Sequence, residues 1–285
     1  MIIISIHIFP QELTEYKRLM SSLNKTITHI RDINQFKLVT TLNLNETLTP
    51  VGDAASHIIN SFRKINESSK FGYDELVTSD KNFLGVNEHR NYTIDMSATN
   101  DSIIFLDSDM HFNANILAHH ENANKILETK HEHYIITPTV VRLWDTTWDC
   151  IVHDEFKTKS HDFYKNINCN LIETHDFGKV KLTPIKTFKW GGGWFNCISA
   201  NLLKAIKIPK TFRGYGPDDT FVMECCKIMK SKNYDIQQYV LKNVVVCETP
   251  HPTKNKPHLR PTIPNFREES NKHFHREINN FSKKL

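Results

Sequence analysis

The sequence predicts an α/β fold, in which helices cover a mainly parallel sheet. The order of strand and helix patterns predicts this class, and the chain length predicts the number of domains. Short β-branched apolar segments alternate along the chain with segments whose apolar residues recur at helical spacing. The chain has 285 residues, enough to bury a large core, and neither an internal repeat nor a low-complexity linker divides it. A single compact domain is therefore expected.

The first half supplies the clearest alternation. Strands are expected at residues 2–9, 36–44, 73–78 and 102–106, and the helices between them at 13–27, 54–65 and 86–96. Further along, helices are expected at 116–127, 200–206 and 221–229, with a strand at 134–137. Strand and helix units in this order are typical of a parallel sheet with helices on its faces.

Composition excludes several classes of protein. Apolar residues make up 39% of the chain and charged residues 24%, which favours a soluble globular protein over a disordered or fibrous one. The six cysteines form no C-x-x-C pair, so neither a zinc knuckle nor a disulfide framework is indicated, and reduced thiols in a cytoplasmic compartment are expected. The apolar start, residues 1–10, falls well short of the roughly 20 residues that span a bilayer.

The first candidate site follows the strand at 102–106. Asp107 and Asp109 leave the core together at the carboxyl end of that strand, where ligands bind in parallel α/β sheets. Carboxylates so placed can hold a hard divalent cation that also bridges to phosphates. An ordinary acidic loop is the alternative interpretation of this D-x-D segment.

The surrounding residues add a family resemblance. A G-x-x-x-x-R-N segment, with Gly85, Arg90 and Asn91, opens a helix that precedes the aspartate pair. Here the sequence resembles the nucleotide-sugar glycosyltransferases of the GT-A fold, especially the inverting family 2. The resemblance implies a Rossmann-like, mostly parallel central sheet, with Asp107 facing the nucleotide and Asp109 ligating the metal.

The same resemblance implies a donor site at the strand ends. Pro10 and Asn43 would border the nucleotide base, with Arg90, Asn91 and Asp107 completing the donor-binding residues. Family members often carry an acidic residue where this chain has Asn43. The expected donor is a UDP-sugar and the expected cofactor is Mn²⁺ or Mg²⁺.

A second match covers residues 190–221. The Trp-Gly-Gly-Gly-Trp run and the later Gly-Pro-Asp-Asp segment resemble family 2 chondroitin-synthase-like enzymes and family 7 galactosyltransferases. The resemblance implies that Asp219 is the catalytic base and that Asp218 binds the acceptor, with Asp218 as the fallback base. It also implies that the acceptor glycan or glycoconjugate meets the glycine run, through residues Trp190, Gly192, Gly193 and Trp194.

Each of these segments also has a purely structural interpretation. Asp218 and Asp219 would cap the N-terminus of the helix that follows them. The glycines would permit a tight turn, and Trp190 and Trp194 would lie in the core rather than stack on a sugar. His251, which lies where the family often places a metal-ligating histidine, would be a surface residue of a proline-rich loop.

The expected reaction is transfer of a sugar to an acceptor hydroxyl with inversion, and Asp219 would take the hydroxyl proton. A retaining GT-A glycosyltransferase is the alternative within the class. A nucleotidyltransferase would need a phosphate-cradling glycine loop near the first strand, which residues 8–12 do not provide. A non-catalytic carbohydrate-binding protein would be indicated by loss of the aspartates, all of which are present.

Three regions are expected within the single domain. Residues 1–110 would bind the nucleotide sugar, residues 111–260 would bind the acceptor and carry the catalytic base, and residues 261–285 would form a basic, helical tail. The tail is interpreted as a solvated helix, or as a contact with an anionic membrane surface at the periphery of a cytoplasmic enzyme. No nucleic-acid partner is expected.

Overall fold

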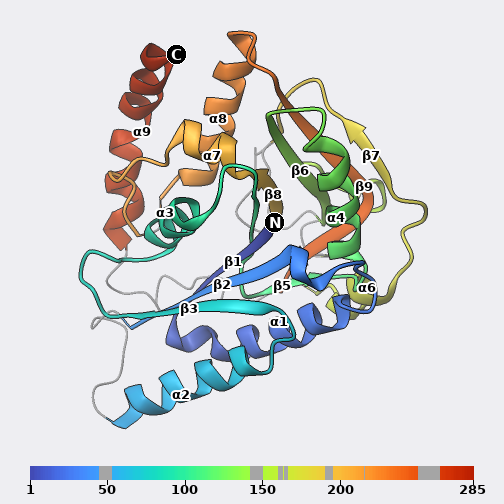
Figure 1. Cartoon of the computed structure of the whole chain (residues 1–285), viewed down its shortest axis with the longest axis vertical. Coiled ribbons are helices and arrows are strands. Elements are labelled where there is room, and N and C mark those ends of the chain that lie inside the picture. The colour runs from blue at the N-terminus through green and yellow to red at the C-terminus, as the bar shows by residue number, and fades with distance from the viewer. Residues whose placement is uncertain are drawn as a thin grey trace.

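A computed structural model describes residues 1–44, 53–141, 150–159, 163, 166–189, 195–214, 216–249 and 264–285. The chain is an α/β domain in which helices flank one sheet, as predicted (Figure 1). The strands in the described ranges are β1 Ile2–Ile8, β2 Phe36–Asn43, β3 Gly72–Thr78, β4 Ser102–Phe105, β5 Met110–Phe112, β6 His133–Val140, β7 Lys181–Pro184, β8 Asn196–Ser199 and β9 Ile236–Glu248. The helices are α1 Leu13–Thr26, α2 Asp53–Glu67, α3 Val86–Met96, α4 Ile116–Leu127, α6 Cys169–Thr174, α7 Ala200–Ile206, α8 Asp218–Ser231 and α9 Pro264–Lys284.

The sheet has the strand order β3-β2-β1-β4-β8-β6-β9-β5, and β7 pairs with β9. The first four strands are parallel to one another, as the alternation of strands and helices predicts. Beyond β4 the pairing is mixed: β8 runs antiparallel to both β4 and β6, whereas β6 and β9 are parallel. The carboxyl ends of β1 and β4 therefore open on one edge, while β8 separates β4 from the second parallel pair.

Residues of β1 alternate between the two faces of the sheet because successive strand side chains point in opposite directions. The even-numbered isoleucines Ile2, Ile4, Ile6 and Ile8 pack in the core on the face covered by α1, α2 and α4. Ile3 packs with the core on the other face, which α7 and α8 cover. Figure 1 shows these two helix layers, with α1 and α2 on one side of the sheet and α3, α7 and α8 on the other.

The C-terminal helix α9 belongs to the second layer. It runs beside α8 (Figure 1) and contributes Phe281, which is buried in the core on that face, with Phe274 and Ile278 packed against it. Glu277 accepts a hydrogen bond from the hydroxyl of Thr211 at 3.2 Å. The region predicted as a basic tail thus includes a helix with an apolar side docked on the domain.

Candidate active site

The aspartate pair lies in a tight turn at the carboxyl end of β4. Leu106 extends the pairing with β1 by donating its N–H to the Ser5 carbonyl at 3.0 Å. The chain then turns, and Met110 starts β5, which pairs with the end of β9. Asp109 is buried and Asp107 is partly exposed. The turn therefore places both carboxylates at the edge where the parallel strands end.

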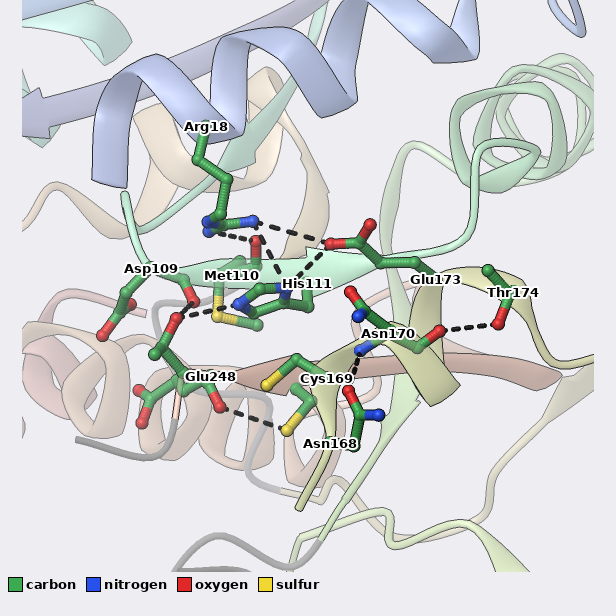
Figure 2. A network of polar contacts seen from close by, with 12 residues as sticks. Arg18, Asp109, Met110, His111, Asn168, Cys169, Asn170, Glu173, Thr174 and Glu248 are labelled. Atoms are coloured by element: carbon green, nitrogen blue, oxygen red, sulfur yellow. Dashed lines mark hydrogen bonds and ion pairs between the residues drawn. The ribbon is translucent and has the colours of Figure 1, made fainter. Parts of the chain in front are cut away.

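The end of β9 fixes the position of Asp109. Thr249 donates two hydrogen bonds to the Asp109 carbonyl oxygen, from its backbone N–H at 2.8 Å and from its hydroxyl at 2.9 Å. The same hydroxyl lies 2.9 Å from Nε2 of His111, and Nδ1 of His111 lies 2.8 Å from the Glu173 carboxylate. Figure 2 shows Arg18 reaching into this network from α1, where it donates to the Met110 carbonyl at 2.8 Å. Four separate segments thus hold the turn.

Asp107 lies in a strongly acidic environment. The pKa of its carboxyl is raised to about 8: burial raises it most, Arg90 lowers it, and the charges of Asp109, Glu248 and Glu12 raise it. Ionising Asp107 beside these carboxylates is costly, because like charges disfavour ionisation. A divalent cation would remove that cost, and carboxylate oxygens are the ligands that Mg²⁺ and Mn²⁺ prefer. Asp107 and Asp109 therefore offer two carboxylates of the kind that such an ion takes as ligands.

Arg90 joins the aspartate pair to the second acidic segment. It projects from α3 and forms a buried ion pair with Asp218, at the start of α8. Its guanidinium also lies 5.0 Å from the centre of the Phe105 ring. Burial alone would lower the pKa of Arg90, but the charges of Asp218, Asp107 and Asp219 outweigh it and raise that pKa. Arg90 is therefore the cation that both acidic segments share.

Asp219 differs from its neighbour. Its carboxylate is partly exposed and accepts hydrogen bonds from the Thr220 N–H at 2.6 Å and the Thr220 hydroxyl at 3.3 Å. Burial, followed by the charge of Asp218, raises its pKa to about 6. A small cavity adjoins both residues and is lined by Arg90, Phe105, Asn196, Asp218, Asp219 and Met223, among others. Asp219 can therefore be ionised at neutral pH while lying beside a cavity.

The glycine segment before α3 is fixed against the loop before α8. Gly85 and Gly214 both donate backbone hydrogen bonds to the Glu88 carboxylate, at 3.0 and 3.0 Å, and Asn87 donates its backbone N–H to the Gly214 carbonyl at 3.1 Å. Burial raises the pKa of Glu88, while the bonds from Gly214 and Gly85 lower it. These bonds hold the first turn of α3 in place and so orient Arg90.

Three residues predicted to bind the donor lie near these elements. Asn43 is fully buried at the end of β2 and donates its amide to the Phe83 carbonyl at 3.0 Å, so it connects β2 to the loop before α3. Pro10 starts a short 3-10 helix after β1, and Asn91, next to Arg90, is partly exposed.

The remaining predicted residues lie outside the described ranges. They are Trp190, Gly192, Gly193, Trp194 and His251. Within the described ranges, no three His, Cys, Asp or Glu side chains are arranged to hold a metal ion. Over the same residues, no helix is long and apolar enough to cross a membrane.

Sequence reasoning missed Glu12, Glu248 and Thr249. Glu12 accepts the Phe9 N–H at 2.8 Å, and its charge acts on Asp107. Glu248 pairs with Met110 across the β5–β9 ladder, next to Asp109. The only signal for Glu248 and Thr249 was their place at the end of an apolar strand, because a contact with a residue so distant in sequence leaves no local pattern.

No family model matches the chain, and no curated protein matches it. Some solved structures are similar in overall arrangement. Among them are GalNAc-T7 with UDP, GalNAc and Mn²⁺ (7% identity, 87% of this chain, TM-score 0.48), HddC from Yersinia pseudotuberculosis (12%, 91%, 0.44) and UDP-glucose pyrophosphorylase with UDP-glucose (9%, 96%, 0.43). The alignment spans 43% of GalNAc-T7 and 98% of each of the other two. At these scores the likeness extends to the arrangement of strands and helices and assigns no residue a role.

Proposed function

We propose that this chain is a metal-dependent glycosyltransferase that moves a sugar from a nucleotide-sugar donor to an acceptor hydroxyl with inversion. The observation that carries the proposal is the meeting of two acidic segments around Arg90. Asp107 and Asp218 both act on this buried guanidinium, although α3 and the start of α8 are far apart in the sequence. The carboxylates proposed to bind the cation and the candidate base, Asp219, would therefore lie around the same buried arginine.

Asp107 and Asp109 would hold the cation, Mn²⁺ or Mg²⁺, and His251 is proposed as a further ligand. When bound, the cation would neutralise negative charge on the diphosphate of the donor, here proposed to be a UDP-sugar. The raised pKa of Asp107, which comes first from burial and then from the neighbouring carboxylates against the lowering effect of Arg90, supports this role, because a bound cation would favour the ionised form. Thr249 would keep the Asp109 backbone in position.

Asp219 would act as the general base. Its pKa of about 6 leaves the carboxylate ionised at neutral pH yet basic enough to accept a proton as the acceptor oxygen attacks the anomeric carbon. The nucleotide diphosphate would leave from the opposite side of that carbon. Asp218 is less suited to the role, since its carboxylate is engaged by Arg90. We propose that Trp190, Gly192, Gly193 and Trp194 contact the acceptor.

The β1 end argues against a nucleotidyltransferase. A loop that cradles phosphates needs free backbone N–H groups, usually supplied by glycines. Here β1 runs into a short helix, Pro10–Glu12, and the Glu12 carboxylate already occupies the Phe9 N–H. The negative charge of the Glu12 carboxylate at that position would also repel a phosphate.

The first experiment measures the melting temperature of the purified chain with nucleotide diphosphates and nucleotide sugars, each with and without Mn²⁺. A ligand that binds only the folded protein raises the melting temperature. We expect a Mn²⁺-dependent rise with one nucleotide, lost in Asp109→Ala and kept in Asp95→Asn, a change at an exposed position of α3. No rise with any nucleotide would overturn the proposed donor site.

The second experiment tests the base once a donor is known. Asp219→Asn should keep the Mn²⁺-dependent rise in melting temperature but reduce transfer by about 100-fold or more, the contribution expected of general-base catalysis. The anomeric configuration of the product, read by NMR, decides the stereochemistry. A product that keeps the configuration of the donor would replace inversion by the retaining alternative.

A further inference from the structure

Two cysteines, Cys169 and Cys247, lie on the elements that contact β5, the strand after the aspartate turn. Cys169 is the first residue of α6, which packs against β5 and β9, and Cys247 is in β9, opposite His111. Cys169 packs against the buried apolar cluster that contains Cys247, and its sulfur interacts with the side chains of both Cys247 and His111. Figure 2 shows Cys169 beside the His111 network. Both cysteines are in the reduced form; Cys247 is fully buried, while Cys169 is partly exposed.

The surroundings of Cys169 favour its thiolate. The pKa of Cys169 is lowered to about 5: the contact with Cys247 lowers it most, burial opposes this, and His111 and the guanidinium of Arg18 also lower it. Burial has the opposite effect on Cys197, Cys225 and Cys226, whose thiol pKa values are raised. A thiolate that solvent can reach is the form that attacks peroxides. Cys169 therefore differs in chemistry from those three buried cysteines.

We propose that Cys169 and Cys247 are a peroxide-sensitive dithiol that closes to a disulfide. The Cys169 sulfur attacks one oxygen of hydrogen peroxide, the O–O bond breaks, and hydroxide leaves and takes up a proton to become water. The Cys169 sulfenic acid formed is then attacked by the Cys247 sulfur, and the S–O bond breaks with loss of a second water. The two thiols lose two electrons, and the peroxide is reduced to two waters.

The position of Cys247 gives the disulfide a structural effect on the aspartate turn. The Cys247 sulfur lies 3.1 Å from the carbonyl oxygen of Glu248, and the next residue, Thr249, holds the Asp109 carbonyl. Disulfide formation ties α6 covalently to the strand end that positions Asp109. Because the bond closes a long loop, we expect the oxidised protein to melt at a higher temperature than the reduced protein.

The test treats the reduced 285-residue chain with a small excess of hydrogen peroxide, blocks the remaining thiols with N-ethylmaleimide and maps the peptides by mass spectrometry. We expect one linked peptide pair, Cys169 with Cys247, that lacks two hydrogen atoms and returns to two thiols with dithiothreitol. Cys169→Ser should abolish it, whereas Cys150→Ser, at another partly exposed cysteine, should leave it unchanged.

Two results would overturn the proposal. One is alkylation of both Cys169 and Cys247 at peroxide doses that oxidise other cysteines. The other is oxidation of Cys169 to sulfinic acid without a linked peptide, which would mean that Cys247 cannot reach it. Mapping of the wild-type chain gives this answer even if a variant at buried Cys247 fails to fold. Neither donor nor metal is present, so the result is independent of the proposed transferase activity.

Discussion

Arg90 of α3 and Asp218 of α8 form an ion pair whose side chains are only 7% and 6% exposed. Charges this deeply buried have lost most of their hydration, so each depends on the other for compensation. The pair also fixes α3 against the start of α8, where Asp219 follows directly. One contact therefore supports the fold and determines the spacing of the candidate site.

Arg90→Met should lower the free energy of unfolding by about 3–5 kcal/mol, because it leaves the Asp218 charge buried without a partner. Urea denaturation measures this. Lys37→Met is the control: its partner Asp74 is more than a third exposed, so its loss should cost at most about 1 kcal/mol. The double variant Arg90→Met with Asp218→Leu should recover part of the loss. If Arg90→Met and Lys37→Met are equally stable, the buried ion pair contributes no more than the exposed one.

Gly85→Ala should destabilise the protein by about 1–3 kcal/mol, the usual cost of forcing extra volume into a packed site. A Cβ at Gly85 would lie 2.9 Å from the Gly214 carbonyl oxygen, a backbone atom held by the Glu88 bridge. Gly72→Ala is a matched control, since a Cβ there meets nothing within 4 Å. Thermal unfolding of both variants makes the comparison. If they melt alike, the loop before α8 is free to move away from α3.

The sequence was sufficient to predict the parallel half of the sheet. β1, β2 and β4 are short, apolar strands, and a helix with an apolar face follows each of β1 and β2, so local patterns and the connection rules determine the arrangement. The turn at Asp107 follows from the same reasoning, because the carboxyl ends of such strands are where loops leave the sheet.

The contacts that complete the site could not be predicted in this way. Thr249 holds the Asp109 carbonyl from 140 residues away, and Arg90 meets Asp218 across 128 residues. Neither leaves a periodic signal. The antiparallel insertion of β8 between β4 and β6 was also unforeseen, since a four-residue strand after a glycine run carries little pattern. Asn43 was predicted at the donor base, and the contact of its amide with the Phe83 carbonyl, 40 residues away, was not foreseen.

The metal-free protein should lose stability as the pH rises from about 4 to about 8. The pKa of Asp107 is raised to about 8 in the folded chain, so over that window the folded state holds a proton that the unfolded state has released. Asp219, with its pKa of about 6, adds a change of the same sign at the lower end of the window. Above pH 7 the slope should therefore come mainly from Asp107.

Asp107→Asn should flatten that slope, because the amide has no proton to release. In chelator, the variant should gain at least about 1 kcal/mol relative to wild type between pH 6 and pH 8, the size of one pKa unit of linkage. Denaturation curves at each pH measure it, and Asp95→Asn should show the wild-type slope. Saturating Mn²⁺ should reverse the wild-type trend by favouring ionised Asp107. An unchanged slope in Asp107→Asn would mean that its carboxyl is ionised throughout.

Phe281→Ala should lower the free energy of unfolding by about 3 kcal/mol, because truncating a buried phenylalanine loses its transfer free energy and leaves a cavity. Phe281 is buried, and its ring lies 6.4 Å from that of Phe221 in α8. Lys283→Ala, at an exposed position of the same helix, should have no measurable effect. A cost of this size requires α9 to unfold together with the rest of the domain. If Phe281→Ala costs nothing globally but speeds hydrogen exchange within α9, the helix instead detaches on its own, as a separate basic tail would.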